Sequence, residues 1–176
     1  MEQSEPHGQT LVDFVTGKEV PDIGAEANRQ AVERFFVEEK GFSKKDIEVN
    51  VPITLEIAGE TYQSRVDLMV CVEGKRMLAV KCAAGSLGSR EREILAAARI
   101  SDTYQIPYAM VSDGKTALLF DTVSGKKIGE GLQQVPSRQT VSAYCRQAEF
   151  IPFPKERLAR EKLIFRSYDS MNVNRI

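Results

Sequence analysis

The sequence is poor in the residue types that build most small metal sites and hydrolytic triads. Histidine occurs once, at His7, and the three cysteines form no CxxC pair. The sequence therefore argues against a zinc site and against a histidine-based triad. It also has no Walker A loop and no glycine-rich dinucleotide motif, so we expect neither a motor nor an organic cofactor in this chain.

A strong net charge and long apolar runs are lacking as well. The formal net charge of −1 gives no overall attraction to DNA or to a membrane, so nucleic-acid binding would need a local basic patch. No apolar run is long enough to span a bilayer, and the first ten residues lack the pattern of a secretory signal. We therefore expect a cytoplasmic protein without a membrane partner.

Three segments are expected along the 176 residues. Residues 1–20 are polar and predict a flexible N-terminal arm. Residues 21–150 alternate between strand and helix patterns and predict one domain with a real core. Proline breaks the chain at Pro152, and residues 151–176 predict a basic helical extension.

The hydrophobic periodicity of the central segment predicts a mixture of helices and strands. The expected elements are a helix over 22–41, strands over 47–57, 62–72 and 77–83, a helix over 89–104, strands over 106–111 and 117–120, and a helix over 137–147. Pro52 lies inside the first long strand, which favours an edge position or a bulge there. This order of elements predicts an α/β fold with a mixed sheet.

Two charges interrupt otherwise apolar strands. Asp67 lies in the first of these strands and Lys81 in the next, and the tight turn between them makes the two strands neighbours. A charge in a buried strand is costly unless it is paired or used, so we expect these side chains to meet. The pair is either a structural cross-strand ion pair or part of an active site that combines a metal-holding carboxylate with an ammonium.

The surrounding pattern resembles the PD-(D/E)xK nucleases, and among them the N-terminal domain of type I restriction enzyme R subunits. That family places an Asp at the end of one strand and a Glu-x-Lys pair on the next, followed by a helix and by a further strand and turn. Segments 64–70, 79–85 and 106–114 stand at the corresponding places of this sequence.

The resemblance covers roughly residues 22–121. It implies a restriction-endonuclease-like αβββαβ core with a mixed central sheet flanked by helices. It also implies hydrolysis of DNA phosphodiester bonds with Mg²⁺ or Mn²⁺ as cofactor. The implied partners are DNA and a protein partner or motor subunit.

The sequence departs from the family at one carboxylate of the second strand. Aligned on Cys82, Lys81 takes the place of the family's Glu, and Ala83 that of its Lys; aligned on the lysine, Ala79 replaces the Glu. Either the next helix supplies the missing ligand, or Lys81 neutralises Asp67. In the second case the domain binds nucleic acid or a partner without cleaving.

If the next helix supplies the missing carboxylate, the expected catalytic residues are Asp67, Lys81 and Glu91. Glu91 comes one helical turn before the apolar stripe, so the sequence predicts that it faces the sheet, and Glu93 is the second candidate. Asp67 and Glu91 would hold Mg²⁺, which prefers oxygen ligands. Acids in a first helical turn also complement the helix dipole, which explains both glutamates without catalysis. The expected supporting or phosphate-binding residues are Glu26, Arg65 and Arg90.

Overall fold

A six-stranded sheet runs through the part of the chain, residues 8–171, that the computed structural model describes. Its strands are β3 (Ile47–Ile57), β4 (Glu60–Val72), β5 (Lys75–Cys82), β6 (Tyr108–Ser112), β7 (Ala117–Asp121) and β8 (Lys127–Glu130), in this order across the sheet. Strands β5 and β6 are parallel, and every other neighbouring pair is antiparallel. The mixed sheet confirms the α/β fold class with helices flanking a central sheet.

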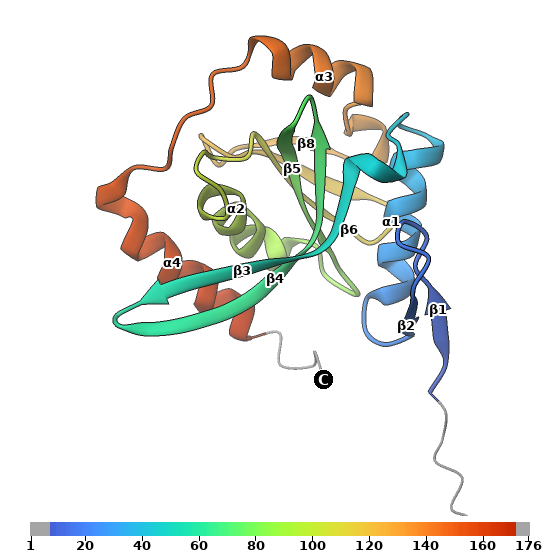
Figure 1. Ribbon diagram of the computed structural model, residues 1–176, viewed down its shortest axis with the longest axis horizontal. Helices are drawn as coiled ribbons and strands as arrows, with labels where there is room; N and C mark the ends of the chain where they lie inside the picture. Colours follow the sequence, from blue (N-terminus) through green and yellow to red (C-terminus); the bar gives the residue numbers. More distant parts are fainter. Residues whose placement is uncertain (1–7, 172–176) are drawn as a thin grey trace, which may run out of the picture.

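Helices cover both faces of the sheet. Helix α1 (Glu26–Glu38) lies on one side, and helices α2 (Glu91–Ile100) and α4 (Lys155–Ser170) lie on the other (Figure 1). Helix α3 (Arg138–Gln147) is capped at its N-terminus by Ser137, whose hydroxyl accepts a hydrogen bond from the Thr140 amide. Short 3-10 turns complete the chain: η1 (Lys44–Asp46), η2 (Gly88–Arg90) and η3 (Leu132–Gln134).

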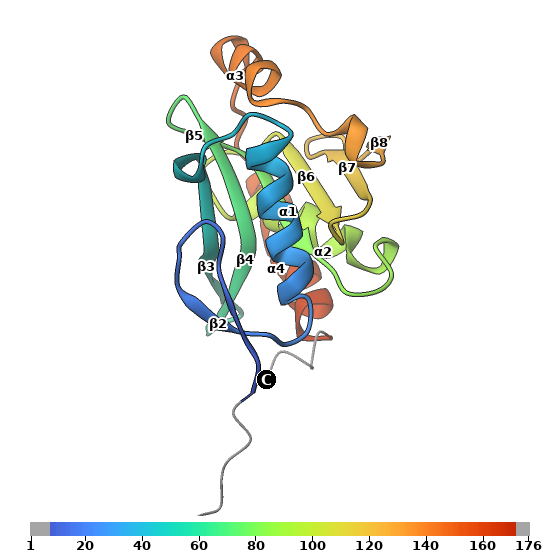
Figure 2. The same ribbon diagram turned by 90° about the vertical axis from the view of Figure 1, so that its right-hand side faces the viewer.

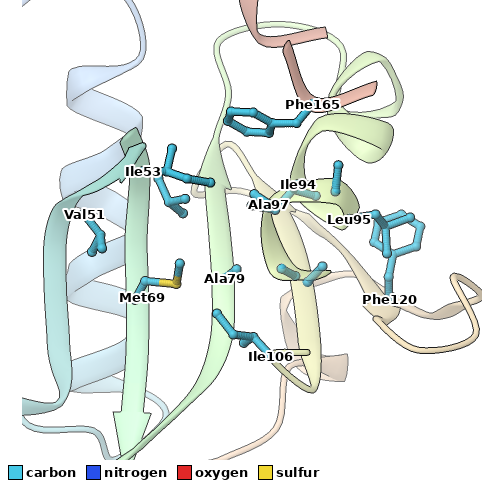
Figure 3. Packing of buried hydrophobic residues seen from close by; sticks show 14 of the residues in the cluster. Val51, Ile53, Met69, Ala79, Ile94, Leu95, Ala97, Ile106, Phe120 and Phe165 are labelled. Carbon is cyan, nitrogen blue, oxygen red and sulfur yellow. The ribbon is translucent and has the colours of Figure 1, made fainter. Parts of the chain in front are cut away.

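Each face of the sheet has its own buried core. Alternate residues of β3 and β4 point into a cluster under α2 and α4, where Ile53, Met69, Ile94 and Phe165 meet (Figure 3). The second cluster lies on the other face, where Ile47 of β3 and Leu68 of β4 pack with Val32 and Phe36 of α1 and with residues of α3. The period-2 pattern of a strand buried on both faces is regular in β6, where Ala109 and Val111 belong to the first cluster and Met110 to the second.

Helix α2 is buried nearly all round, because the sheet covers one side of it and α4 the other. The seven consecutive residues 93–99 are all buried. Arg99 and Glu161 form a buried ion pair, with 3.0 Å between Nη1 and Oε1, that fastens α4 to α2. No helix of residues 8–171 is long and apolar enough to cross a membrane.

The N-terminal segment differs from the expected arm. Residues 1–7 lie outside the described part, but β1 (Thr10–Val12) and β2 (Glu19–Pro21) pair as an antiparallel hairpin. Asp13 accounts for this order, since its carboxylate accepts hydrogen bonds from the amides of Val15 and Thr16. Such a side-chain turn is built from local polar groups, and hydrophobic periodicity does not report it.

The structure confirms the predicted edge position of the first long strand and shortens the predicted second helix. Strand β3 is an edge strand, as Pro52 indicated. Helix α2 ends at Ile100, short of the predicted end at residue 104. The short edge strand β8 follows the turn at Gly125 and was not among the predicted elements.

Candidate functional site

A cleft of about 600 Å³ lies at the C-terminal end of β5, beside the start of α1. Segments from both ends of the chain contribute to it, because β2 and the end of α4 lie at the same end of the molecule (Figure 2). Its charged and amide-bearing lining residues are Glu26, Arg29, Asn50, Arg65, Asp67, Lys81 and Arg90. The two strand charges predicted to meet are therefore in the cleft, and all three expected supporting residues line it.

Asp67 and Lys81 lie across from each other where the β4–β5 ladder ends. The last regular pair before them is Leu68 with Val80. Beyond that pair the Asp67 carboxylate accepts a hydrogen bond from the Cys82 amide at 2.8 Å, in place of a backbone carbonyl. The Asp67 side chain thereby becomes fixed toward β5, and its Oδ2 lies 3.7 Å from the Lys81 ammonium.

A second carboxylate reaches the same ammonium from the helix behind the sheet. Glu93 Oε1 lies 3.4 Å from Lys81 Nζ. Glu93 and Lys81 are 4% and 7% exposed, so this contact is buried, whereas Asp67 is half-buried at the cleft. The ammonium thus lies between two carboxylates that come from different elements, and low solvent access strengthens their mutual attraction.

Glu91, the first candidate from the sequence, points elsewhere. It is half-buried and forms no ion pair with Lys81 among residues 8–171. Its charge instead contributes to raising the pKa of Lys127 on β8, after the larger effect of Glu130. The carboxylate of α2 that meets Lys81 is therefore Glu93, and a metal-binding role for Glu91 stays a prediction.

Glu26 and Arg29 join the cleft to a buried polar network on α1. Arg29 Nε donates to Glu26 at 3.0 Å, and its Nη2 lies 3.1 Å from Asp13. Beneath them Glu33 is fully buried, and neither of its carboxylate oxygens has a hydrogen-bond partner in the described part of the chain. Burial, together with the nearby Asp13 carboxylate, raises the pKa of Glu33 to about 8.

The cationic side of the cleft contains two arginines that are free for a ligand. Arg65 is exposed on β4 and Arg90 is half-buried at the end of η2. Neither forms an ion pair with another described residue, whereas Arg29, Arg76 and Arg99 each do. Unpaired guanidinium groups beside a pair of carboxylates suit a phosphate ligand.

Asn50 and Cys82 complete the cleft. Asn50 lies within β3 with a φ of +52°, and it has no register partner between the pairs formed by Val49 and Val51. The Cys82 thiol is buried, and burial with the Asp67 carboxylate nearby raises its pKa well above the usual value. It therefore stays protonated and is no candidate nucleophile or metal ligand.

Glu93, Arg29 and Asn50 are the site residues that the sequence ranked low or missed. Glu93 could not be separated from Glu91 by periodicity, because α2 has no single buried face. For Asn50 the available signal was a polar residue in a strand, two residues before the Pro52 that already suggested an irregularity. Nothing in the sequence distinguished Arg29 from the other charged residues of its helix.

Comparison with known proteins bears on the part of the chain that forms this cleft. No curated protein and no solved structure matches the chain. A protein family matches over residues 24–136, which include every strand of the sheet. The matched family is "Type I restriction enzyme R protein N terminus (HSDR_N)", and the chain belongs to it.

Proposed function

We propose that the domain is a nuclease of the PD-(D/E)xK type that hydrolyses phosphodiester bonds of DNA. Helix α2 supplies the carboxylate that β5 lacks. The observation that carries the proposal is the convergence of Asp67 and Glu93 on Lys81, at 3.7 Å and 3.4 Å, beside an open cleft. Membership of the restriction enzyme R family supports a nuclease-like role.

The residues present fit Mg²⁺ better than a softer metal. Two carboxylates from different elements supply hard oxygen donors, whereas no three His, Cys, Asp or Glu side chains of residues 8–171 form a metal cage. Mg²⁺ commonly takes one or two carboxylates and keeps several waters, so a full protein cage is not needed. When bound, the ion would supply polarisation of a phosphate oxygen and a water of lowered pKa.

The chain's own groups have separate roles in this proposal. The Lys81 ammonium stabilises the negative charge that develops on the phosphate in the transition state. Asp67 is held ready by the Cys82 amide, so its carboxylate needs no reorientation. Arg65 and Arg90 bind the flanking phosphates and position the strand over the site.

A cleavage assay with matched amide variants tests the proposal. Labelled single-stranded and duplex DNA are incubated with Mg²⁺ or Mn²⁺ and with wild type, Asp67→Asn, Glu93→Gln or Glu91→Gln. We expect Asp67→Asn and Glu93→Gln to lower the rate at least about a hundredfold, as removal of one charged active-site group commonly does. Glu91→Gln is the control and keeps the rate. Equal cleavage by wild type and Asp67→Asn would remove this site from consideration.

A second candidate function is a module that binds DNA without cleaving it. The favouring observation is the position of Lys81, which lies directly across from Asp67 and already neutralises part of the carboxylate charge that would attract a metal. Under this alternative, DNA binding is unchanged by EDTA and wild type cleaves nothing. Lys81→Met separates the two functions, because a nuclease should lose cleavage but keep or strengthen metal binding.

The family also suggests where the domain works. We infer a cytoplasmic setting with DNA as partner, in association with other subunits of a restriction enzyme, one of which provides the motor. Co-purification of the chain with the other subunits of the restriction enzyme tests this inference. A domain that never associates with them would contradict it.

A further inference from the structure

The N-terminal hairpin β1–β2 forms part of the cleft but is held in place by few apolar contacts. Val20 and Pro21 of β2 line the cleft together with Glu26 and Arg29 of α1. The hairpin buries little apolar surface of its own, and Val12 is 64% exposed. A segment of this kind opens at a low free-energy cost. The polar contacts between the hairpin and α1 therefore decide how often it opens.

Asp13 and Phe14 fasten the hairpin to α1. The Phe14 amide donates to Gln30 Oε1 at 2.7 Å, and Gln30 Nε2 donates to Asp13 Oδ2 at 3.1 Å. Nη2 of Arg29 lies 3.1 Å from the same Asp13 oxygen. The side chains of Asp13, Arg29 and Gln30 are all buried. A buried ionic contact is stable only when its charges are compensated.

The charges at this contact are not balanced unless one proton is present. Glu33 is fully buried on α1, and its Oε1 lies 3.9 Å from Arg29, which also pairs with Asp13 and Glu26. The remaining titratable group that faces Glu33 is the Cys82 thiol of β5, which stays neutral. Three carboxylates would thus share one guanidinium. Within residues 8–171 neither Glu33 oxygen accepts a hydrogen bond.

A proton on Glu33 removes both difficulties. Neutral Glu33 leaves Arg29 with two carboxylates, and its O–H can donate to Asp13, which lies within hydrogen-bonding reach. Burial and the Asp13 carboxylate raise the pKa of Glu33 to about 8, so the folded protein holds this proton at neutral pH. Loss of the proton would bring a second carboxylate against Asp13 and would offer Arg29 a partner within α1. Both effects favour release of the hairpin.

We propose that the N-terminal hairpin is a strap on the cleft, and that a proton shared between Glu33 and Asp13 keeps the strap closed. In the open form Glu33 gains solvent and ionises more easily, so the closed form binds more protons than the open form. The open fraction therefore grows by up to about tenfold for each pH unit, until the pH reaches the pKa of Glu33. Control of entry to the cleft rests on the proposed function, since it regulates that same site.

Hydrogen exchange followed by NMR tests the strap without DNA. The reporter is the Phe14 amide, because its acceptor Gln30 belongs to α1, whereas amides of the buried strand β6 report global unfolding. Protection factors, which correct for the intrinsic pH dependence of exchange, are measured from pH 6 to pH 9. In wild type the Phe14 protection factor should fall by up to about tenfold per pH unit and level off above about pH 8. It should stay below that of β6 throughout, because the hairpin opens without global unfolding.

Two variants assign the pH dependence to the shared proton. Glu33→Gln never ionises and can donate an amide hydrogen to Asp13, so its Phe14 protection factor should not change with pH. Asp13→Asn removes the charge that helps to keep Glu33 neutral and should lose the slope, whether or not the hairpin stays docked. Glu38→Gln, on the exposed end of the same helix, is the matched control and should keep the wild-type slope. A pH-independent Phe14 protection factor in wild type would overturn the proposal, and so would an unchanged slope in either variant.

DNA binding in EDTA tests whether the strap controls entry to the cleft. A labelled duplex is titrated by fluorescence anisotropy at pH 6 and pH 8. The affinity of wild type should rise with pH by up to about tenfold per unit, because the open fraction sets the apparent Kd, while Glu33→Gln should bind equally at both pH values. Equal wild-type affinity at the two pH values would overturn the role in entry, even with the expected exchange results.

The strap and the proposed function fail separately. The expected exchange results without any DNA binding or cleavage would leave the strap standing and remove the nuclease assignment. Asp67-dependent cleavage with a pH-independent Phe14 protection factor would do the reverse.

Discussion

Replacement of Glu33 by glutamine should make the domain more stable, and increasingly so as the pH rises. Glu33 is fully buried on α1, and its pKa is raised to about 8 by burial and by the nearby Asp13 carboxylate, against an ordinary value of 4.5. Between these two values the unfolded chain carries an ionised Glu33 and the folded chain a neutral one. Folding must then take up a proton, so the stability of the wild type falls as pH rises through this window.

The size of the effect follows from the two pKa values. Each pH unit between them costs about 1.4 kcal/mol, so the penalty grows from about 1 kcal/mol at pH 5 to about 4 kcal/mol at pH 8. Glutamine has nearly the same shape and never ionises, and therefore avoids the penalty. Burying the amide has a cost of its own, but that cost does not depend on pH, so the slope is the quantity to measure.

Urea unfolding at several pH values between 5 and 8 measures this slope. The difference in unfolding free energy between Glu33→Gln and wild type should rise by about 3 kcal/mol across the range. Glu38→Gln, on the exposed end of the same helix, is the control and should show almost no slope. A constant difference for Glu33→Gln would refute the reasoning, because it would mean that Glu33 ionises with its ordinary pKa in the folded protein.

Two other predictions concern the packing around the site. Glu161→Ala removes the partner of the buried Arg99 and should lower the unfolding free energy by about 3–5 kcal/mol. Urea unfolding at pH 7 measures this loss. A loss below about 1 kcal/mol would mean that the ion pair does not hold α4 against α2. Burial and the Asp67 carboxylate raise the pKa of Cys82 well above the usual value, so a thiol reagent at pH 8 should leave Cys82 unmodified until the protein unfolds. Peptide mapping that finds Cys82 labelled in the folded protein, at the rate of a free thiol, would contradict this burial.

The pairing of Asp67 with Lys81 was predictable because it depends on local rules. A tight turn makes consecutive strands neighbours, and an isolated charge in each apolar strand needs a partner. The mixed sheet was predictable for a similar reason, since the order of strands and helices restricts the topology. The structure has both features, and the Asp67 carboxylate also accepts a hydrogen bond from the Cys82 amide, which no sequence pattern reported.

The choice between Glu91 and Glu93 was not predictable in the same way. Periodicity identifies the buried face of a helix that has one exposed side, but α4 covers the outer side of α2. That cover depends on contacts such as the pair between Arg99 and Glu161, which are 62 residues apart in the chain. The position of the N-terminal hairpin likewise depends on hydrogen bonds that the Asp13 carboxylate accepts from the Thr16 amide of its own loop and from the Gln30 side-chain amide of α1.

Manganese binding followed by electron paramagnetic resonance tests the central claim most directly, because Mn²⁺ is a common spectroscopic substitute for Mg²⁺ with the same preference for oxygen ligands. The account predicts that wild type and Glu91→Gln bind one Mn²⁺, and that Asp67→Asn and Glu93→Gln lose it while remaining folded. Manganese that remains bound to both Asp67→Asn and Glu93→Gln would contradict the account, as would a wild type that binds none.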